Sequence, residues 1–144
     1  MANINEKTIE AMNTAWNTKN AERIVEHFSD EISFEDPFTS TPIKGKTAVK
    51  GYLTGLFTAF PDFKVTVGKT VIQGNTAVAL NTATATNTGP IQTPDGKKLA
   101  ATGKKFVHEA AVYSEYDAKG KATKVKVYGD SATIFKQLGL PPPQ

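Results

Sequence analysis

The sequence contains no cysteine and little histidine or arginine. Without cysteine, its 144 residues cannot form disulfides, thiolate nucleophiles or zinc–thiolate sites. The two histidines, His27 and His108, are too few for a histidine-rich metal site. Arg23 is the single arginine, and the lysines are scattered rather than clustered with aromatic residues, so the sequence does not resemble a nucleic-acid-binding surface. We therefore expect no metal, no cofactor and no nucleic-acid partner.

Long hydrophobic runs are also absent. No apolar stretch approaches the roughly 20 residues that a membrane-spanning helix needs, and the start "MANINEKTIE" is polar, unlike a secretory signal. We therefore expect a cytoplasmic protein with no membrane partner. The length is that of one domain, which we place at residues 1–144, with a core at about 5–140 and a proline-rich tail at 141–144.

Helical periodicity dominates the first part of the chain. Ile9, Met12 and Trp16 form one apolar stripe within residues 5–18. A second short helix is predicted to follow Asn20 as N-cap. The segment "GKTAVKGYLTGLFTAFPD" predicts the longest helix, with Thr47 as cap and the following proline as stop.

The pattern changes to alternation after this third helix. Four segments rich in valine and threonine read as strands: "DFKVTVGKTVIQ", "GNTAVALNTATATNTG", "KKFVHEAAVYSEY" and "ATKVKVYGD". A short last helix should start at Ser131 and end at Gly139 in a left-handed cap, with Leu140 contacting Phe135. Helices followed by strands predict an α+β fold, a curved antiparallel sheet wrapped around helices in a cone whose hollow binds ligands.

Two acids interrupt an apolar strand in "SFEDPFTS". Alternation places Asp36 on the same face as Phe34 and Ile32, and Glu35 on the opposite face. Burial would raise the pKa of Asp36 and make it a usable acid or base near neutral pH. The alternative is an aspartate that caps the turn before "FTST" by accepting backbone N–H bonds.

Four more residues are candidates for the chemistry or for ligand binding. Asp130 ends the last strand, where it could act as an acid/base or simply cap the following helix. Tyr128 shares its face and could supply a phenolic donor. His108, on one face with Phe106, should point into the cone, where it could polarise a carbonyl or serve as an ordinary core histidine. Trp16 could stack on a flat ligand, or belong to the core.

The sequence resembles a known superfamily. The segment "FSDEISFEDPFTSTPIKGKTAVKGYL" is similar to the nuclear-transport-factor-2-like α+β cones. Within them, "FPDFKVTV", "GNTAVAL", "PDGKKL" and "DSATIFKQLG" most resemble the SnoaL-like polyketide cyclases, over residues 5–140. The resemblance implies that Asp36 stands where ketosteroid isomerases keep their proton-moving aspartate, and Asp130 where the cyclases keep their acid/base aspartate.

The sequence departs from both patterns. Met12 stands near the position of the isomerases' oxyanion tyrosine, and Asn87 near that of the cyclases' histidine. Either Asn87, His108 or Tyr128 would then have to hold an enolate oxygen.

Two functions follow. The first is a cofactor-free acid/base enzyme, similar to a polyketide cyclase or isomerase and less to an epoxide hydrolase. It would act on a small apolar carbonyl compound, with Asp36, Asp130 and His108 as catalytic residues and Trp16, Phe34, Asn87, Phe106 and Tyr128 as ligand-binding residues. The alternative is a non-catalytic module for binding small ligands or for dimerisation. In addition, the segment "TAVALNTATAT" at 76–86 has small apolar and threonine side chains on both faces, which favours a homodimer through the outer sheet face.

Overall fold

The computed structural model describes residues 4–39, 41–92 and 96–141. Its helices are α1 (Glu6–Asn17), α2 (Ala21–Val25), α3 (Lys46–Ala59) and α4 (Ser131–Leu138). Its strands are β1 (Phe28–Glu35), β2 (Ile43–Lys44), β3 (Lys64–Gln73), β4 (Thr76–Thr86), β5 (Ile91–Gln92), β6 (Lys98–Leu99), β7 (Lys105–Tyr116) and β8 (Ala122–Tyr128). Most of the predicted proline-rich tail, residues 142–144, lies outside the described residues.

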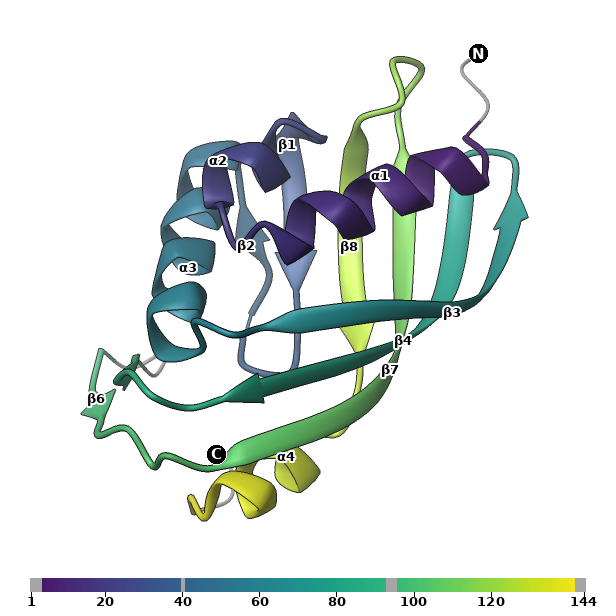
Figure 1. Ribbon diagram of the computed structural model, residues 1–144. Coiled ribbons are helices and arrows are strands. Elements are labelled where there is room, and N and C mark those ends of the chain that lie inside the picture. Colours follow the sequence, from purple (N-terminus) through teal and green to yellow (C-terminus); the bar gives the residue numbers. More distant parts are fainter. Residues whose placement is uncertain (1–3, 40, 93–95, 142–144) are drawn as a thin grey trace.

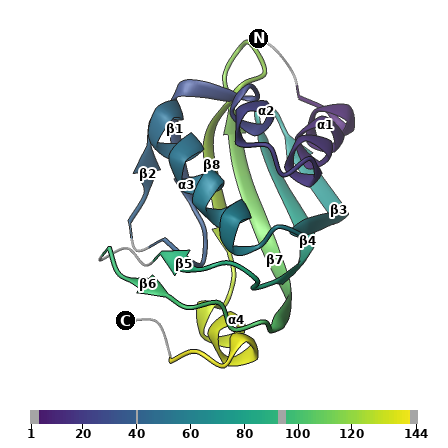
Figure 2. The ribbon, with the colours of Figure 1, turned by 60° about the vertical axis from the view of Figure 1, so that its left-hand side comes forward.

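One curved sheet carries the fold, in the order β2-β1-β8-β7-β4-β3, and β5 and β6 form a separate hairpin. Helix α1 crosses one face of this sheet, and α3 packs beside β1 (Figure 1). The hairpin and α4 lie at the same end of the long strands (Figure 2). The predicted α+β fold is confirmed.

One strand pair departs from the expected antiparallel pattern. Strand β1 pairs with β8 in parallel, with Phe34 opposite Val125, whereas the other pairs in the two sheets are antiparallel. These two strands come from opposite ends of the chain and lie side by side (Figure 1). Alternation within each strand predicts the strand but not its partner or direction.

The edge strand β3 bends at a bulge. The β3–β4 register shifts between Val67 and Thr70, and a Cβ on Gly68 would lie 2.8 Å from the Leu80 carbonyl oxygen. Glycine therefore permits the close backbone approach that a bulge needs, and the bulge increases the local bend of the strand. The Asn17 side chain then fastens α1 to this edge, donating from Nδ2 to the Val65 carbonyl at 2.9 Å and accepting from the Val65 N–H at 2.8 Å.

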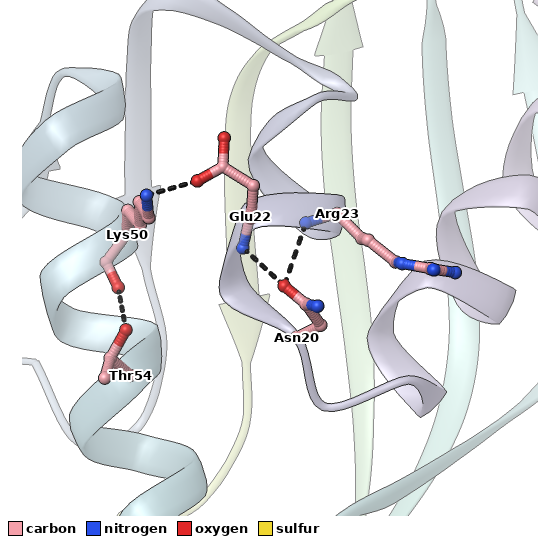
Figure 3. Close-up of polar contacts among 5 residues, drawn as sticks. All are labelled: Asn20, Glu22, Arg23, Lys50 and Thr54. Atoms are coloured by element: carbon pink, nitrogen blue, oxygen red, sulfur yellow. Dashed lines mark hydrogen bonds and ion pairs between the residues drawn. The ribbon is translucent and has the colours of Figure 1, made fainter.

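The second helix is held by its cap and by an ion pair. The Asn20 carboxamide oxygen accepts from the N–H groups of Glu22 and Arg23 at 3.0 and 3.4 Å, which confirms the predicted N-cap (Figure 3). The Glu22 carboxylate pairs with Lys50 and so joins α2 to α3 (Figure 3). Within α3 the Thr54 hydroxyl donates to the Lys50 carbonyl at 2.9 Å.

The ends of the later helices were predicted with mixed success. The Thr47 cap is wrong, because α3 starts after Gly45, whose φ of 92° suits glycine, and no side chain caps it. The Gly139 cap is confirmed: its φ is 72°, and the Leu140 N–H donates to the Phe135 carbonyl at 2.9 Å.

Apolar side chains fill the space between the helices and the concave face. The largest fully buried side chains include Phe28, Phe34, Phe60 and Phe106. The outer face of the sheet instead leaves large apolar residues exposed, with Leu80 at 55% and Tyr128 at 53%. Within the part of the chain that the structure describes, none of the helices has the length and apolar character needed to cross a membrane.

Candidate functional site

A cavity of about 130 Å³ lies between α1 and the concave face of the sheet. A single water needs about 10–15 Å³ on this measure, so the cavity has room for roughly ten waters or for a small ligand. Most of its wall is apolar. The polar residues among its described lining are Asn13, Asp36, Asn81, His108, Ser114 and Tyr116.

Asp36 reaches this cavity from the end of β1. It follows Glu35, the last residue of the strand, and alternation puts it on the side of the fully buried Phe34. Its Oδ1 accepts from the Phe38 N–H at 2.8 Å, and its own N–H donates to the Thr39 hydroxyl at 3.1 Å. The cavity-facing acid and the turn-capping aspartate, which the sequence left as alternatives, are thus combined in one residue.

Burial raises the pKa of Asp36 to about 6, although hydrogen bonds from Tyr52, Phe38 and Thr39 oppose the rise. Loss of hydration disfavours the charged form, and these donors compensate only in part. The direction is the one expected for an acid that faces an apolar cavity. At a pKa near 6 the group is ionised for most molecules at neutral pH but remains easy to protonate.

Tyr52 on α3 is a site residue that the sequence analysis missed. Its hydroxyl lies 2.8 Å from Oδ1 and 2.7 Å from Oδ2 of Asp36. Burial and the neighbouring carboxylate raise the pKa of Tyr52 well above its ordinary value, so it remains a protonated donor. A signal was present, because Tyr52 lies three residues after Val49 and four before Leu56, on the buried stripe of the helix.

His108 lies on the cavity wall and is 7% exposed. Its Nε2 accepts a hydrogen bond of 3.0 Å from the Asp130 backbone N–H, which places the proton of the neutral ring on Nδ1. Burial lowers the pKa of His108 and so favours this neutral form. Gly129 makes room for the ring, because a Cβ there would lie 2.0 Å from His108 Cε1.

The side chain of Asp130 caps α4 and is not among the groups that line the cavity. It accepts from the N–H groups of Ala132 and Thr133 at 3.0 and 3.3 Å and from the Thr133 hydroxyl at 2.6 Å. These hydrogen bonds, led by that of the Thr133 hydroxyl, lower the pKa of Asp130. Asp130 therefore contributes its backbone N–H to His108 rather than a second carboxylate to the cavity.

Two other predicted residues also lie away from the cavity. Tyr128 points to the outer face, because alternation along β8 turns Val125 and Val127 inward instead. Asn87 is fully buried, but its amide donates to the carbonyls of Ala59 and Gly89 at 3.3 and 2.7 Å and accepts from the Thr102 N–H at 2.8 Å. It ties loops together and has no contact with the cavity.

The predicted aromatic residues do line the cavity. Trp16, Phe34 and Phe106 all contribute to its wall. The half-buried Trp16 ring stacks on Phe34 at 6.0 Å between centroids and packs against Phe63 at the same distance, so it is part of the core and of the wall at once. Across residues 4–39, 41–92 and 96–141, no three acidic or histidine side chains gather in a way that could hold a metal ion.

Residues 9–125 match the model of the SnoaL-like domain. This match covers most of the chain. The protein belongs to the SnoaL-like domain family. Among curated proteins no match is found.

Solved structures with this architecture are similar in fold at low identity. A protein of ketosteroid isomerase-like fold from Catenulispora acidiphila DSM 44928, in complex with trimethylamine, is 16% identical with a TM-score of 0.78, over 96% of each chain. A protein from Jannaschia sp. CCS1 assigned as a SnoaL-like polyketide cyclase is 14% identical with a TM-score of 0.79, over 94% of this chain and 92% of that one. SalBIII, an epoxide hydrolase/cyclase-like enzyme in pyran ring formation in the polyether salinomycin, is 18% identical with a TM-score of 0.72, over 89% and 92%.

Proposed function

We propose that this SnoaL-like protein is a cofactor-free acid/base enzyme of the cyclase or isomerase kind that acts on a small, apolar carbonyl compound. The observation that carries the proposal is the Asp36 carboxylate, which faces an apolar cavity and whose pKa burial raises to about 6. Such a group is ionised near neutral pH yet basic enough to accept a proton from carbon.

The reaction begins with proton transfer to Asp36. The carboxylate takes the proton from the carbon next to the substrate carbonyl, and the C–H electron pair moves into the carbonyl to give an enolate. Asp36 then returns the proton. In an isomerisation it goes to another carbon of the same molecule; in a cyclisation the enolate carbon attacks a second carbonyl, whose oxygen takes the proton. Either outcome leaves Asp36 ready for the next substrate.

The enolate oxygen requires a hydrogen-bond donor. His108 is suited to this role, because its Nε2 is occupied by the Asp130 N–H and its neutral ring carries the remaining proton on Nδ1. Removing a donor of this kind by mutation raises the barrier of the chemical step by about 3–4 kcal/mol. In this proposal His108 takes the role of the oxyanion tyrosine that ketosteroid isomerases carry near the position of Met12.

Tyr52 and the Phe38 N–H hold the carboxylate in one orientation. Their hydrogen bonds of 2.7–2.8 Å come from α3 and from the turn after β1. A base fixed by packed neighbours keeps the geometry that proton transfer from carbon needs. Tyr52 is therefore a positioning residue.

The family match and the cyclase-like neighbours support a cyclase-type reaction. Epoxide opening by water is less favoured, because it is helped by one group that activates water and a second acid that protonates the epoxide oxygen. Asp36 faces the cavity, whereas Asp130 has both carboxylate oxygens committed to the cap of α4.

The alternative is a binding module of the same fold. It is favoured by one observation: both oxygens of Asp36 already accept hydrogen bonds within the protein, as in a purely structural aspartate. Hydrogen–deuterium exchange at carbon distinguishes the two. Small enolisable ketones such as 1-tetralone, incubated in D₂O with the protein, should exchange their α-hydrogens faster with the parent than with Asp36→Asn. Binding without any acceleration of exchange would favour the module.

A further inference from the structure

Two asparagines that line the cavity each have a buried amide oxygen with no partner among the described residues. Asn13 on α1 and Asn81 on β4 both line the cavity, and the Oδ1 atom of each is buried with no hydrogen bond among the described residues. A buried amide oxygen without a partner destabilises the folded state, because it has lost its hydrogen bonds to water and gained none in return. Such groups are rare in folded proteins, and two in one largely apolar cavity point to a ligand.

The backbone contacts bring these two side chains to the same end of the cavity. Asn17, one turn after Asn13, is fastened to Val65, and Asn81 pairs with Val67. Helix α1 and strand β3 run in opposite directions (Figure 1). Moving one turn back along the helix, from Asn17 to Asn13, therefore leads in the same direction as moving two residues forward along the strand, from Val65 to Val67. Asn13 thus lies near Asn81, the partner of Val67.

This end lies away from Asp36. Strand β1, which carries Asp36 at its end, is separated from β4 by β8 and β7. With about 4.8 Å between neighbouring strands, the two positions are roughly 14 Å apart along the sheet, less where the sheet curves. Because all three side chains line the same cavity, a ligand with polar groups at its two ends can contact Asp36 with one end and the asparagines with the other.

We infer that Asn13 and Asn81 form a second recognition point, which binds a neutral hydroxyl group of the substrate at the end remote from the Asp36 carboxylate. This inference rests on the proposed function for the position of the carbon that Asp36 deprotonates. A hydroxyl fits because it donates to one amide oxygen and accepts from an amide N–H. No lysine or arginine is found among the described residues that line the cavity, so an anionic group would lack a counter-charge there.

Calorimetric binding of three probes tests the inference: 1-tetralone, 6-hydroxy-1-tetralone and 7-hydroxy-1-tetralone. The parent should bind one of the hydroxylated ketones about tenfold more tightly than 1-tetralone, as expected for one or two net hydrogen bonds. Asn13→Leu and Asn81→Leu should each remove this preference while binding 1-tetralone as well as the parent does or better.

Two controls accompany these variants. Thr82→Val changes the neighbouring residue of β4, which alternation turns to the outer face, and should keep the hydroxyl preference. The melting temperatures of Asn13→Leu and Asn81→Leu should equal or exceed that of the parent, because each removes an unpartnered buried oxygen.

The inference is overturned if none of the probes binds, if the parent shows no hydroxyl preference, or if the preference survives both leucine substitutions. A parent without a hydroxyl preference is the result expected if the two amides bind only water. The outcome is separable from that of the proposed function, because binding is measured without turnover. A hydroxyl preference without any acceleration of α-hydrogen exchange would refute the proposed catalytic function and leave the recognition point at Asn13 and Asn81 supported.

Discussion

The Tyr52 hydroxyl donates to both carboxylate oxygens of Asp36, at 2.8 Å to Oδ1 and 2.7 Å to Oδ2. The two residues are 16 positions apart and come from α3 and from the end of β1. Burial raises the pKa of Asp36, whereas the Tyr52 hydrogen bond lowers it. This pair therefore sets how basic the candidate catalytic carboxylate is.

Tyr52→Phe should raise the pKa of Asp36 above about 6, because it removes the largest of the hydrogen bonds that oppose burial. Any activity that depends on ionised Asp36 should then reach half its maximum at a higher pH than in the parent. Stability should fall by about 1–3 kcal/mol at pH 8, where a buried carboxylate loses a donor, and by less at pH 5. Tyr113→Phe is the matched control, since the Tyr113 hydroxyl donates to a different carboxylate, that of the partly buried Glu115, at 2.5 Å. An unchanged pH profile for Tyr52→Phe would refute the tuning role.

Asp36→Asn should change how stability depends on pH. The folded pKa of about 6 exceeds the ordinary value of 3.8, so the folded state holds its proton more tightly than the unfolded state. Stability in the parent therefore decreases as the pH rises from 3.8 through 6, by about 3 kcal/mol from this group. The asparagine variant lacks this loss, so urea unfolding should show its stability gaining on the parent between pH 4 and 7 and then levelling. An asparagine variant that instead loses stability relative to the parent as the pH rises would mean a lowered pKa and a structural aspartate.

Asp130→Asn should leave stability within well under about 1 kcal/mol of the parent, because asparagine caps a helix about as well as aspartate. Asp130→Ala should cost about 1 kcal/mol, since the N–H groups of Ala132 and Thr133 lose their acceptor. Neither change removes the backbone N–H that holds His108, so ligand binding and any turnover should persist in the asparagine variant. Loss of most turnover with an unchanged melting temperature would instead restore Asp130 as the acid/base.

Alternation within a strand predicted the inward direction of several side chains, but the prediction that Tyr128 serves the site was wrong, because Tyr128 lies on the outer face of β8. Asp36, Phe34 and His108 reach the cavity because each follows the inward face of its own strand. Asp130 lies beyond the end of β8, where the demands of a helix start decide its contacts. Tyr52 was missed because a tyrosine on a buried helical stripe looks like an ordinary core residue.

Contacts between distant segments account for the other differences. The parallel β1–β8 pair and the bonds of Asn87 to Ala59 and Thr102 join parts of the chain whose proximity no local pattern encodes. The cap of α3 depended on the backbone at Gly45 rather than on the Thr47 hydroxyl. Sequence periodicity thus predicted the main helices and long strands. Contacts between segments distant in the sequence decided which polar groups meet.

We propose that the exposed apolar face of the sheet binds a second copy of the chain. Leu80 and Tyr128 both pair with Ala111 across neighbouring strands, and Val71 pairs with Val78 on the same outer surface. Exposed fractions of 55% for Leu80 and 58% for Val71 are unusual for large apolar groups gathered in one patch. Sedimentation should show a homodimer at micromolar concentration, and Leu80→Glu should shift it towards monomer while its melting curve stays cooperative. A parent that sediments as a monomer would rule out this interface.

The most direct test of the account is a carboxyl-resolved NMR titration of Asp36, with the resonance assigned by its absence in Asp36→Asn. The account predicts a pKa of about 6, because the carboxylate faces an apolar cavity and its donors compensate only partly for lost hydration. A pKa at or below the ordinary value of 3.8 would contradict it, since Asp36 would then be a turn-capping group too weakly basic to remove a proton from carbon.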